Sequence, residues 1–390
     1  MRCFAPAHLA VLSGSRSAQL DAWAMERAGV PGSALMERAG AGAAALVAHA
    51  ASRGPVLVLA GGGNNGGDAL VVARTLRAWG REVEVLLTAE RAWPDPLLHG
   101  WDVPCRPSRT LADDVLSAHL QAALAREGAV VDGVLGTGAR GAPRGEAERV
   151  VRLLGVAREA GTLRGRVVAL DVPSGVDADT GEVAGAAVHA HLTVAFGWPK
   201  LGTLLHPGRA RAGRLVALEI GFPPLPDDFA GIRLLTPAWA EARLPRRPPE
   251  THKNAVGAVA VVAGSPGMAG AAVLAARAAL RAGAGFVRVV SPGANREIVQ
   301  CALPEAVFVD AGDADAVADA LRASRAVLAG PGLGTAPEAA ALLERVLAHA
   351  APLVLDADAL NLLAGDPERR LRARPAPTVL TPHPGEAARL

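Results

Sequence analysis

The stretch VLVLAGGGNNGGDALVVARTLRAWG, residues 56–80, decides the fold of the first half of the chain. Residues 55–60 form a short apolar run that ends at glycines, which is typical of a buried strand. Residues 68–79 have the apolar spacing of a helix that stops at Gly80, and a second strand is expected at 82–88. A strand, a glycine-rich turn, a helix and a strand together form a βαβ unit.

The same alternation recurs along the chain. It returns in GAVVDGVLGTGARG (128–141), RVVALDVPSGVDADTGEVAG (166–185) and AHLTVAFGWPKLG (190–202), and a second series starts at residue 258. Alternating strands and helices predict an α/β protein with doubly wound parallel sheets, whose ligands lie at the carboxyl ends of the strands. Dense proline predicts a linker at 226–250, between a domain at 1–225 and a second at 251–390.

Composition narrows the classes of partner. The formal net charge is +2 and tyrosine is absent, so neither nucleic acid nor an anionic membrane is expected as a partner. Three scattered cysteines indicate reduced thiols in a cytoplasmic protein, and no secretion signal or membrane span is visible. We therefore expect a small-molecule substrate, and the sequence leaves a homo-oligomer open.

The glycine-rich loop admits more than one interpretation. Gly61, Gly63 and Gly66 satisfy G-x-G-x-x-G, a dinucleotide fingerprint that is weak when it stands alone. Glycines at the start of a helix suit a phosphate, because backbone N–H groups are free there. The fingerprint does not require the two asparagines of the loop or Asp68, which could instead complement the helix dipole.

Three predicted strand tips supply hard oxygen donors: Asn65, Asp132 and Ser174. That set suits an alkali or alkaline-earth cation and does not suit zinc. His189 and His191 lack a third ligand nearby, so we expect structural roles for both.

Lysine is rare in this chain, which has 38 Arg and two Lys, at positions 200 and 253. Lys200 follows Pro199 in a predicted loop. It could bind a phosphate, act as an acid or base, or be a solvated loop charge.

The second half of the chain offers similar strand tips. GSPGMAG (264–270) and GPGLG (330–334) are loops of a size that suits phosphate, and each is a weak signal alone. LDADALN (355–361) and TPHPGE (381–386) add polar groups at two further tips.

Taken together, these stretches resemble the bifunctional NAD(P)H-hydrate repair enzymes, in which an NAD(P)H-hydrate epimerase is fused to an ADP-dependent NAD(P)H-hydrate dehydratase. The resemblance rests on LMERAG, GGGNNGGDALVVAR, VLGTGARG, LDVPSGVDADTGEV and TVAFGWPKLG in the first half. In the second half it rests on residues 252–287, AGPGLG, LDADALN and TPHPGE. It implies a Rossmann-like epimerase domain and a ribokinase-like dehydratase domain.

The resemblance also implies site residues. Potassium would be bound by Asn65, Asp132 and Ser174. The epimerase substrate would be bound by Asn64, Asn65, Gly66, Gly67, Asp68, Gly136, Thr137, Gly138, Ala139, Arg140, Gly141, Ala142 and Asp171. The dehydratase substrate would be bound by Ala271, Gly332 and His383, with ADP as cosubstrate and with magnesium left open.

The chain departs from the family pattern at several points. It lacks the usual aromatic residue near positions 268–270 and has Asn254 where a glycine is usual. It stops at Leu390, before the segments that meet ADP phosphates in the family, so we expect a truncated and inactive dehydratase half.

Epimerisation at C6 of the reduced ring would proceed by loss of the C6 hydroxyl as water and readdition on the other face, which needs an acid/base. Asp171 is our first candidate for that group and Lys200 the second. The alternatives are a ribokinase-like kinase with an N-terminal nucleotide-binding domain, a Rossmann dehydrogenase and a non-enzymatic binding module.

Overall fold

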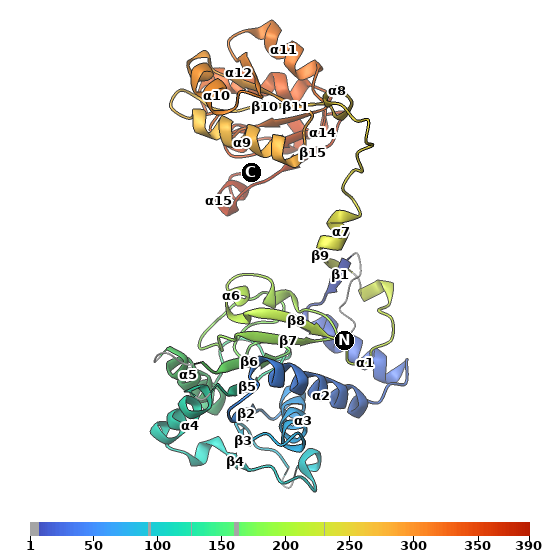
Figure 1. The fold of residues 1–390 in the computed structure, drawn as a ribbon, viewed down its shortest axis with the longest axis vertical. Helices are drawn as coiled ribbons and strands as arrows, with labels where there is room; N and C mark the ends of the chain where they lie inside the picture. Colours follow the sequence, from blue (N-terminus) through green and yellow to red (C-terminus); the bar gives the residue numbers. More distant parts are fainter. Residues whose placement is uncertain (1–7, 93–94, 126, 160–163, 230) are drawn as a thin grey trace. The chain divides into compact units, whose positions relative to one another are not determined.

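A computed structural model describes residues 8–390 except 93–94, 126, 160–163 and 230. The chain divides into two compact units, unit 1 (Met1–Leu244) and unit 2 (Pro245–Leu390), whose elements are labelled in Figure 1. The division falls inside the segment 226–250 that the sequence predicts as a linker.

Unit 1 is built on a seven-stranded sheet in which every neighbouring pair is parallel. Successive strands are added outward from β2 to β4 on one side of the sheet and from β5 to β8 on the other. The topological switch point therefore lies between β2 and β5. The strands, in order across the sheet, are β4 (Cys105–Pro107), β3 (Val83–Leu87), β2 (Val56–Ala60), β5 (Ala129–Gly133), β6 (Arg166–Leu170), β7 (Leu192–Phe196) and β8 (Arg214–Leu218).

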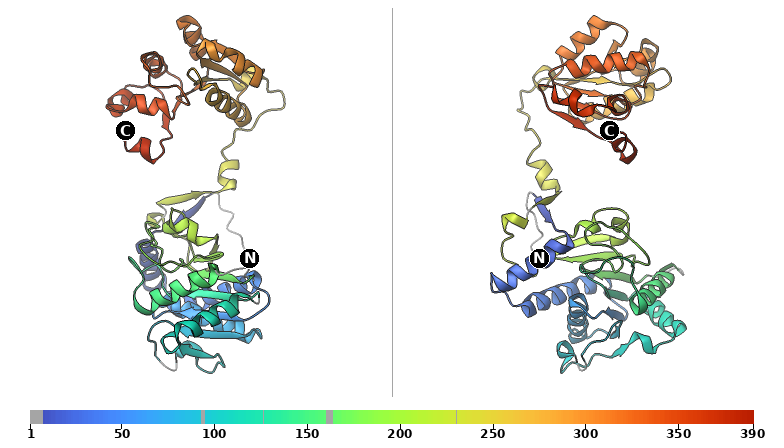
Figure 2. Two further views of the ribbon diagram at one scale, coloured as in Figure 1. Left: turned by 90° about the vertical axis from the view of Figure 1, so that its left-hand side faces the viewer. Right: turned by 180° about the vertical axis from the view of Figure 1, so that it is seen from behind.

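Helices cover both faces of this sheet (Figure 2). The helices of unit 1 are α1 (Gly14–Glu26), α2 (Gly32–Ala50), α3 (Asn64–Ala78), α4 (Asp113–Ala125), α5 (Gly145–Glu159), α6 (Gly208–Ala212) and α7 (Pro237–Glu241). The helix expected to begin at residue 68 begins at Asn64 instead, so the two asparagines and the two glycines of residues 64–67 are part of α3.

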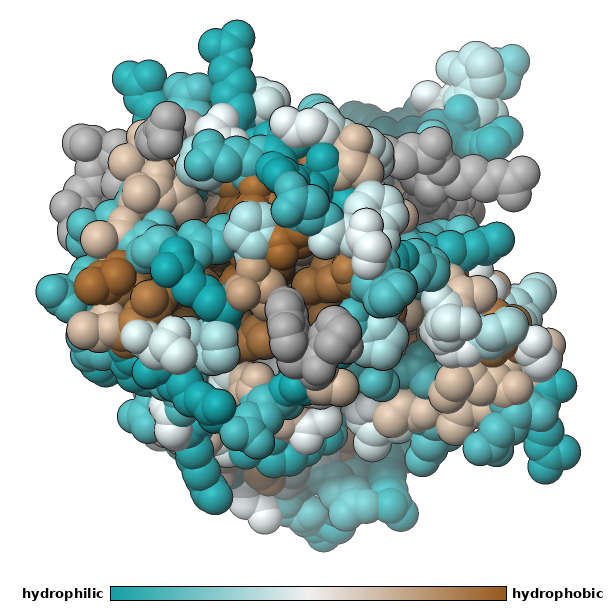
Figure 3. Space-filling model, turned by 90° about the horizontal axis from the view of Figure 1, so that it is seen from below, coloured by the Kyte–Doolittle hydropathy of each residue, from teal (hydrophilic) through white to brown (hydrophobic). Residues whose placement is uncertain are grey.

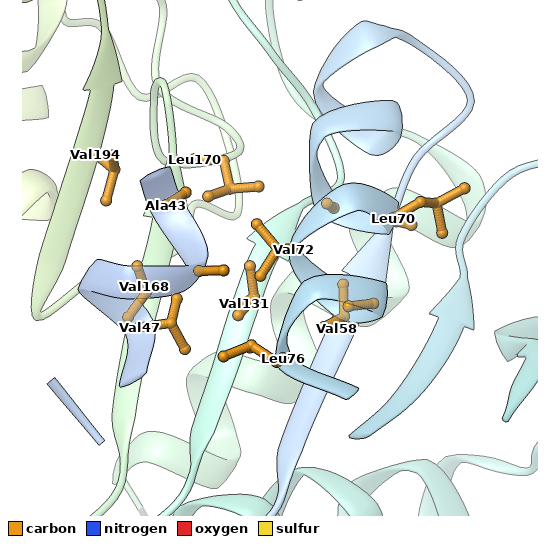
Figure 4. Close-up of a cluster of buried hydrophobic side chains, with 14 of the residues drawn as sticks. Ala43, Val47, Val58, Leu70, Val72, Leu76, Val131, Val168, Leu170 and Val194 are labelled. Atoms are coloured by element: carbon orange, nitrogen blue, oxygen red, sulfur yellow. The ribbon is translucent and has the colours of Figure 1, made fainter. Parts of the chain in front are cut away.

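Strand β2 shows why the sheet is covered on both sides. All five of its residues are apolar and buried, as expected for a central parallel strand. Val58 packs with α2 and α3, as Figure 4 shows, whereas Leu57 and Leu59 pack with α4 and α5 on the opposite face. Helices α2 and α3 approach closely because Gly40 has no side chain: a Cβ there would lie 2.4 Å from Cβ of Val71.

A small antiparallel ribbon joins the two ends of unit 1. Strand β1 (His8–Val11) pairs with β9 (Ile232–Leu235), which precedes α7. The first part of the predicted linker 226–250 thus contains regular structure, a strand and a helix of unit 1.

Unit 2 has a six-stranded, all-parallel sheet with its own switch point between β10 and β13. In order across the sheet the strands are β12 (Val307–Asp310), β11 (Phe286–Ser291), β10 (Ala258–Val262), β13 (Ala326–Ala329), β14 (Leu353–Leu355) and β15 (Thr378–Leu380). The helices are α8 (Lys253–Val256), α9 (Ala269–Ala282), α10 (Arg296–Ala302), α11 (Ala314–Arg322), α12 (Pro337–Ala348), α13 (Asp358–Leu363), α14 (Pro367–Arg372) and α15 (Pro384–Ala387).

These findings confirm the predicted fold class, α/β with parallel sheets in two parts. Within the described ranges, no helix is long and apolar enough to span a bilayer.

One face of unit 1 is mostly hydrophilic, with hydrophobic side chains gathered toward its middle (Figure 3). Cys105 and Cys301 carry free thiols, and Cys3 lies outside the described residues.

Candidate functional site

A cavity of about 880 Å³ opens at the carboxyl edge of the unit 1 sheet. Loops that follow β2, β5, β6 and β7 contribute to its wall, and α1 closes one side. Many of the residues predicted to form the site line it: Asn64, Asn65, Gly66, Asp68, Gly136, Thr137, Gly138, Ala139, Arg140, Asp171 and Lys200.

The clustered glycines mainly allow close packing of the backbone. A Cβ on Gly66 would lie 1.9 Å from the carbonyl oxygen of Gly61, and a Cβ on Gly61 would lie 2.0 Å from that of Val134. Gly63, by contrast, faces open space at the N-cap of α3. Two of the three fingerprint glycines are thus needed so that the loops after β2 and β5 can touch, whatever ligand the cavity holds.

The three predicted cation ligands are linked by hydrogen bonds at the carboxyl edge of the sheet. Ser174 Oγ donates to Asp132 Oδ1 at 2.6 Å, and the Ser174 amide donates to Asp132 Oδ2 at 2.8 Å. The Asn65 amide nitrogen donates to the carbonyl of Leu135 at 2.7 Å, while the amide of Leu135 donates to Ser174 Oγ at 2.9 Å.

Asn65 Oδ1 is a buried acceptor without a hydrogen-bond partner among the described residues. A buried oxygen left unpaired costs free energy, and a bound cation would remove that cost. Asp132 is fully buried, and burial raises its pKa to about 6 despite the hydrogen bonds from Ser174. One carboxylate, one hydroxyl and one free amide oxygen fit an alkali cation.

Lys200 is buried, with 1% of its side chain exposed, so the interpretation as a solvated loop charge is wrong. Its ammonium donates to Asp171 Oδ1 and to the carbonyl of Phe196, the latter at 2.8 Å. The Phe196 amide also donates to Asp171 Oδ1, at 3.0 Å. Asp171 has φ +62°, a left-handed conformation that is uncommon outside glycine and frequent at functional sites.

Two more carboxyl groups line the same cavity, Asp68 from α3 and Asp21 from α1. Because α3 begins at Asn64, Asp68 lies beyond the first turn, so the expected helix-dipole role is wrong. Burial, and secondarily the charges of Asp171 and Asp21, raise the pKa of Asp68 well above its usual value, against the opposing effect of Lys200. Burial likewise raises the pKa of Asp21 to about 6.

Sequence reasoning missed Asp21. The one available signal was its position beside the buried Leu20 and three residues before the buried Ala24, which places it near the inner face of α1. That pattern occurs in many helices and does not single out a functional residue.

Arg140 fixes the loop after β5. Its guanidinium donates to Asp179 at 2.7 Å and to the carbonyl of Thr137 at 2.9 Å. Asp179 in turn accepts the amide of Gly14 at the start of α1. The loop, the segment after β6 and α1 are therefore tied together at the rim of the cavity.

Some predicted site residues lie elsewhere. Gly67, Gly141 and Ala142 are absent from the cavity lining, and so are the predicted cation ligands Asp132 and Ser174. A Cβ on Gly67 would meet Met36 at 2.8 Å.

The two histidines for which structural roles are expected contact neighbouring residues. His191 accepts the amide of Val167 at 2.9 Å, and His189 accepts from Arg158 at 2.8 Å.

In unit 2 the loops after β10 and β13 lie in contact. A Cβ on Gly332 would lie 2.8 Å from Cβ of Ala271, which brings two of the three residues predicted there together. His383 lies at the same sheet edge after β15, two strands away from β13, where it caps α15 and pairs with Glu386.

Comparison with known proteins points to one family in both halves. Residues 32–202 match the model described as "YjeF-related protein N-terminus", and residues 259–390 match the NAD(P)H-hydrate dehydratase model.

Curated relatives match across both units. The bifunctional NAD(P)H-hydrate repair enzyme of Moorella thermoacetica is 39% identical, over 86% of this chain and 65% of its own length. The enzyme of the same name from Salinibacter ruber is 39% identical, over 97% of this chain and 75% of its own length. The chain thus spans about two thirds to three quarters of the length of these relatives.

Among solved structures, an ADP/ATP-dependent NAD(P)H-hydrate dehydratase from Bacillus subtilis is 34% identical. That match covers 40% of this chain and 54% of the other, with a TM-score of 0.33.

Proposed function

The chain belongs to the bifunctional NAD(P)H-hydrate repair enzyme family, and from this premise we propose that unit 1 interconverts the R and S forms of NADH and NADPH hydrated at C6. The observation that carries the proposal is the ion pair between buried Lys200 and partly buried Asp171, both of which line a cavity of about 880 Å³. The volume is in the range of small-molecule and cofactor sites.

The mechanism follows from the way these two residues are held. Inversion at C6 requires the hydroxyl to leave as water, which gives a conjugated iminium, and water to add to the other face. Lys200 pairs with Asp171 Oδ1, and no hydrogen bond to Asp171 Oδ2 is present within the described residues. Oδ2 is therefore free to take a proton from the entering water, and the hydrogen bonds to Oδ1 hold the carboxyl group in place for that purpose.

Potassium fits the donor set of Asn65, Asp132 and Ser174, because an unpaired oxygen and a buried carboxylate both gain from a cation. When bound, it would supply positive charge near the substrate phosphates. We expect epimerase turnover to be higher in potassium than in sodium at equal ionic strength. Equal rates in the two salts would contradict a specific potassium site.

The direct test is turnover of purified R-hydrate of NADH in potassium buffer, with a separate S-specific dehydratase as the coupling enzyme. Rapid conversion is expected, and a rate equal to the spontaneous one would overturn the proposal. Asp171→Asn should lower kcat by about 10²–10⁴-fold while hydrate still binds, because the base is lost and the shape is kept. Near-normal turnover by this variant would exclude Asp171 as the base.

For unit 2 we propose ADP-dependent dehydration of the S form, with Ala271, Gly332 and His383 at the substrate. The match of residues 259–390 to the dehydratase family supports this proposal over a ribokinase-like kinase. Incubation of the protein with S-hydrate, ADP and magnesium tests this proposal against the expectation of an inactive half, and formation of reduced nucleotide would support the proposal. Failure would leave the epimerase proposal intact, since that reaction is measured separately.

A further inference from the structure

We propose that Asp68 is a second catalytic residue of unit 1, the proton donor to the departing C6 hydroxyl, and that it works with Asp171 as an acid–base pair. This inference rests on the epimerase function proposed above. It adds a role that follows from geometry. The carboxyl groups of Asp68 and Asp171 line the same cavity, but the charged groups that surround them differ.

Asp68 is buried and unpaired. Its residue is 9% exposed, it lines the cavity, and its carboxyl group makes no side-chain hydrogen bond within the described residues. A carboxyl group that faces a cavity without a partner is costly when ionised and can offer its proton to a ligand when neutral. A merely structural carboxyl at this depth would be expected to have a partner.

Charged groups reach Asp68 from three directions. Asp171 follows β6, Asp21 projects from α1, and Lys200 follows β7. Burial and the two carboxylates favour the neutral form of Asp68 and raise its pKa, and Lys200 opposes them less strongly. Lys200 instead makes its direct contact with Asp171. One carboxyl group therefore has a cationic partner and the other has none within the described residues, which assigns the base role to Asp171 and the acid role to Asp68.

One proton is given and one is taken up in each turnover. Neutral Asp68 gives its proton to the C6 hydroxyl, the C6–O bond breaks, and water leaves with the bonding pair while the ring nitrogen lone pair forms the iminium. Water then bonds to C6 on the other face, and its surplus proton goes to ionised Asp171. The reverse reaction exchanges the two roles, and the open cavity lets solvent return the proton to Asp68 between forward turnovers.

Asp21 is a positioning residue in this scheme because it acts through Asp68. Its negative charge favours the neutral form of Asp68. Removing that charge should lower the pKa of Asp68 and leave its carboxyl group in place.

The experiment compares Asp68→Asn, Asp21→Asn and Asp114→Asn with the wild-type chain in the coupled epimerase assay across pH. Asp114 is an exposed residue in the first turn of α4 and serves as the matched control. Asp68→Asn should lower kcat by about 10²–10⁴-fold with KM little changed, because the amide keeps the shape and loses the proton. Wild-type kcat should fall as pH rises through the raised pKa of Asp68, and Asp21→Asn should move that fall to lower pH.

The outcomes separate the two claims. Wild-type activity with undiminished kcat in Asp68→Asn overturns the assignment of Asp68 and leaves the proposed function standing. A fall in kcat at the same pH in Asp21→Asn and wild type overturns the coupling between the two groups. Absence of wild-type turnover overturns the proposed function and this inference with it. A thermal melt checks folding, and Asp68→Asn should melt no lower than wild type, because the amide keeps the shape of a buried carboxyl group that has no hydrogen-bond partner to lose within the described residues.

Discussion

Lys200 combines full burial with a charge, and this has a cost that can be measured. Replacing Lys200 by Met leaves Asp171 as a buried carboxylate without its cation, so the free energy of unfolding should drop by about 3 kcal/mol. The double variant Asp171→Asn/Lys200→Met removes both charges and should recover part of that loss. Urea unfolding of the three proteins measures both effects.

The control for this pair lies on the surface. Arg109 and Glu90 form an ion pair whose side chains are 62% and 83% exposed. Arg109→Met should therefore change the unfolding free energy by less than about 0.5 kcal/mol. A double variant at 171 and 200 that is no more stable than Lys200→Met would show that lost packing, and not an unpaired charge, causes the destabilisation.

His191 makes the stability of unit 1 depend on pH. Burial and, secondarily, nearby arginines lower the pKa of His191 to about 4 from 6.5, so the folded chain takes up its proton less readily than the unfolded chain. The contribution of His191 to the free energy of unfolding is therefore largest above pH 6.5 and is lost as pH falls toward 4. The loss amounts to about 2 kcal/mol after allowance for the partial exposure of the ring.

This dependence is tested by the difference in unfolding free energy between wild type and His191→Gln at pH 7 and pH 4.5. The difference should shrink at the lower pH. The corresponding difference for Gln121→Ala should stay constant, because Gln121 is exposed on α4 and does not titrate. A constant difference for His191 would contradict a lowered pKa.

At the scale of elements, the glycine-rich loop is tested by two matched substitutions. Gly66→Ala puts a methyl group 1.9 Å from the backbone oxygen of Gly61, and a backbone atom in this tight turn cannot move away cheaply. The variant should lose about 3 kcal/mol or more of unfolding free energy. Gly63→Ala adds a methyl group in open space at φ −91° and should stay within about 0.5 kcal/mol of wild type. Thermal and urea unfolding distinguish them, and equal losses would contradict the packing role.

The strands were predictable from the sequence and the start of α3 was not. Apolar runs such as β2 indicate buried parallel strands directly. Asn64, Asn65 and two glycines are weak helix formers, so local propensity placed the helix start four residues late. Tertiary packing against Gly61 and Val134 overrides that propensity.

The site was predictable to the extent that it depends on chain topology. Parallel strands put Asn65, Asp132 and Ser174 at one sheet edge, and the structure brings them together there. The unpaired oxygen of Asn65 and the approach of Asp21 depend on how side chains and α1 pack in three dimensions. No spacing in the sequence encodes either.

At the scale of the whole chain, each unit has hydrophobic clusters made only of its own residues. Arg246 is exposed and lies outside the helices and strands. Brief trypsin digestion should therefore cut first after Arg246 and leave two resistant fragments, because each keeps its own core. Mass spectrometry identifies the cut, and Arg246→Gln should abolish it. Rapid loss of either fragment would contradict independent cores.

The pairing of β1 with β9 ties the first residues of the chain to residues made much later. Leu12, directly after β1, hydrogen-bonds on both sides of Lys200, to the carbonyl of Pro199 at 3.0 Å and the amide of Leu201 at 2.9 Å. A ribosome that adds about 5–20 residues per second needs roughly 10–45 s to travel from β1 to β9. Strand β1 cannot pair with β9 until then, so unit 1 completes this ribbon only after residue 235 has been synthesised.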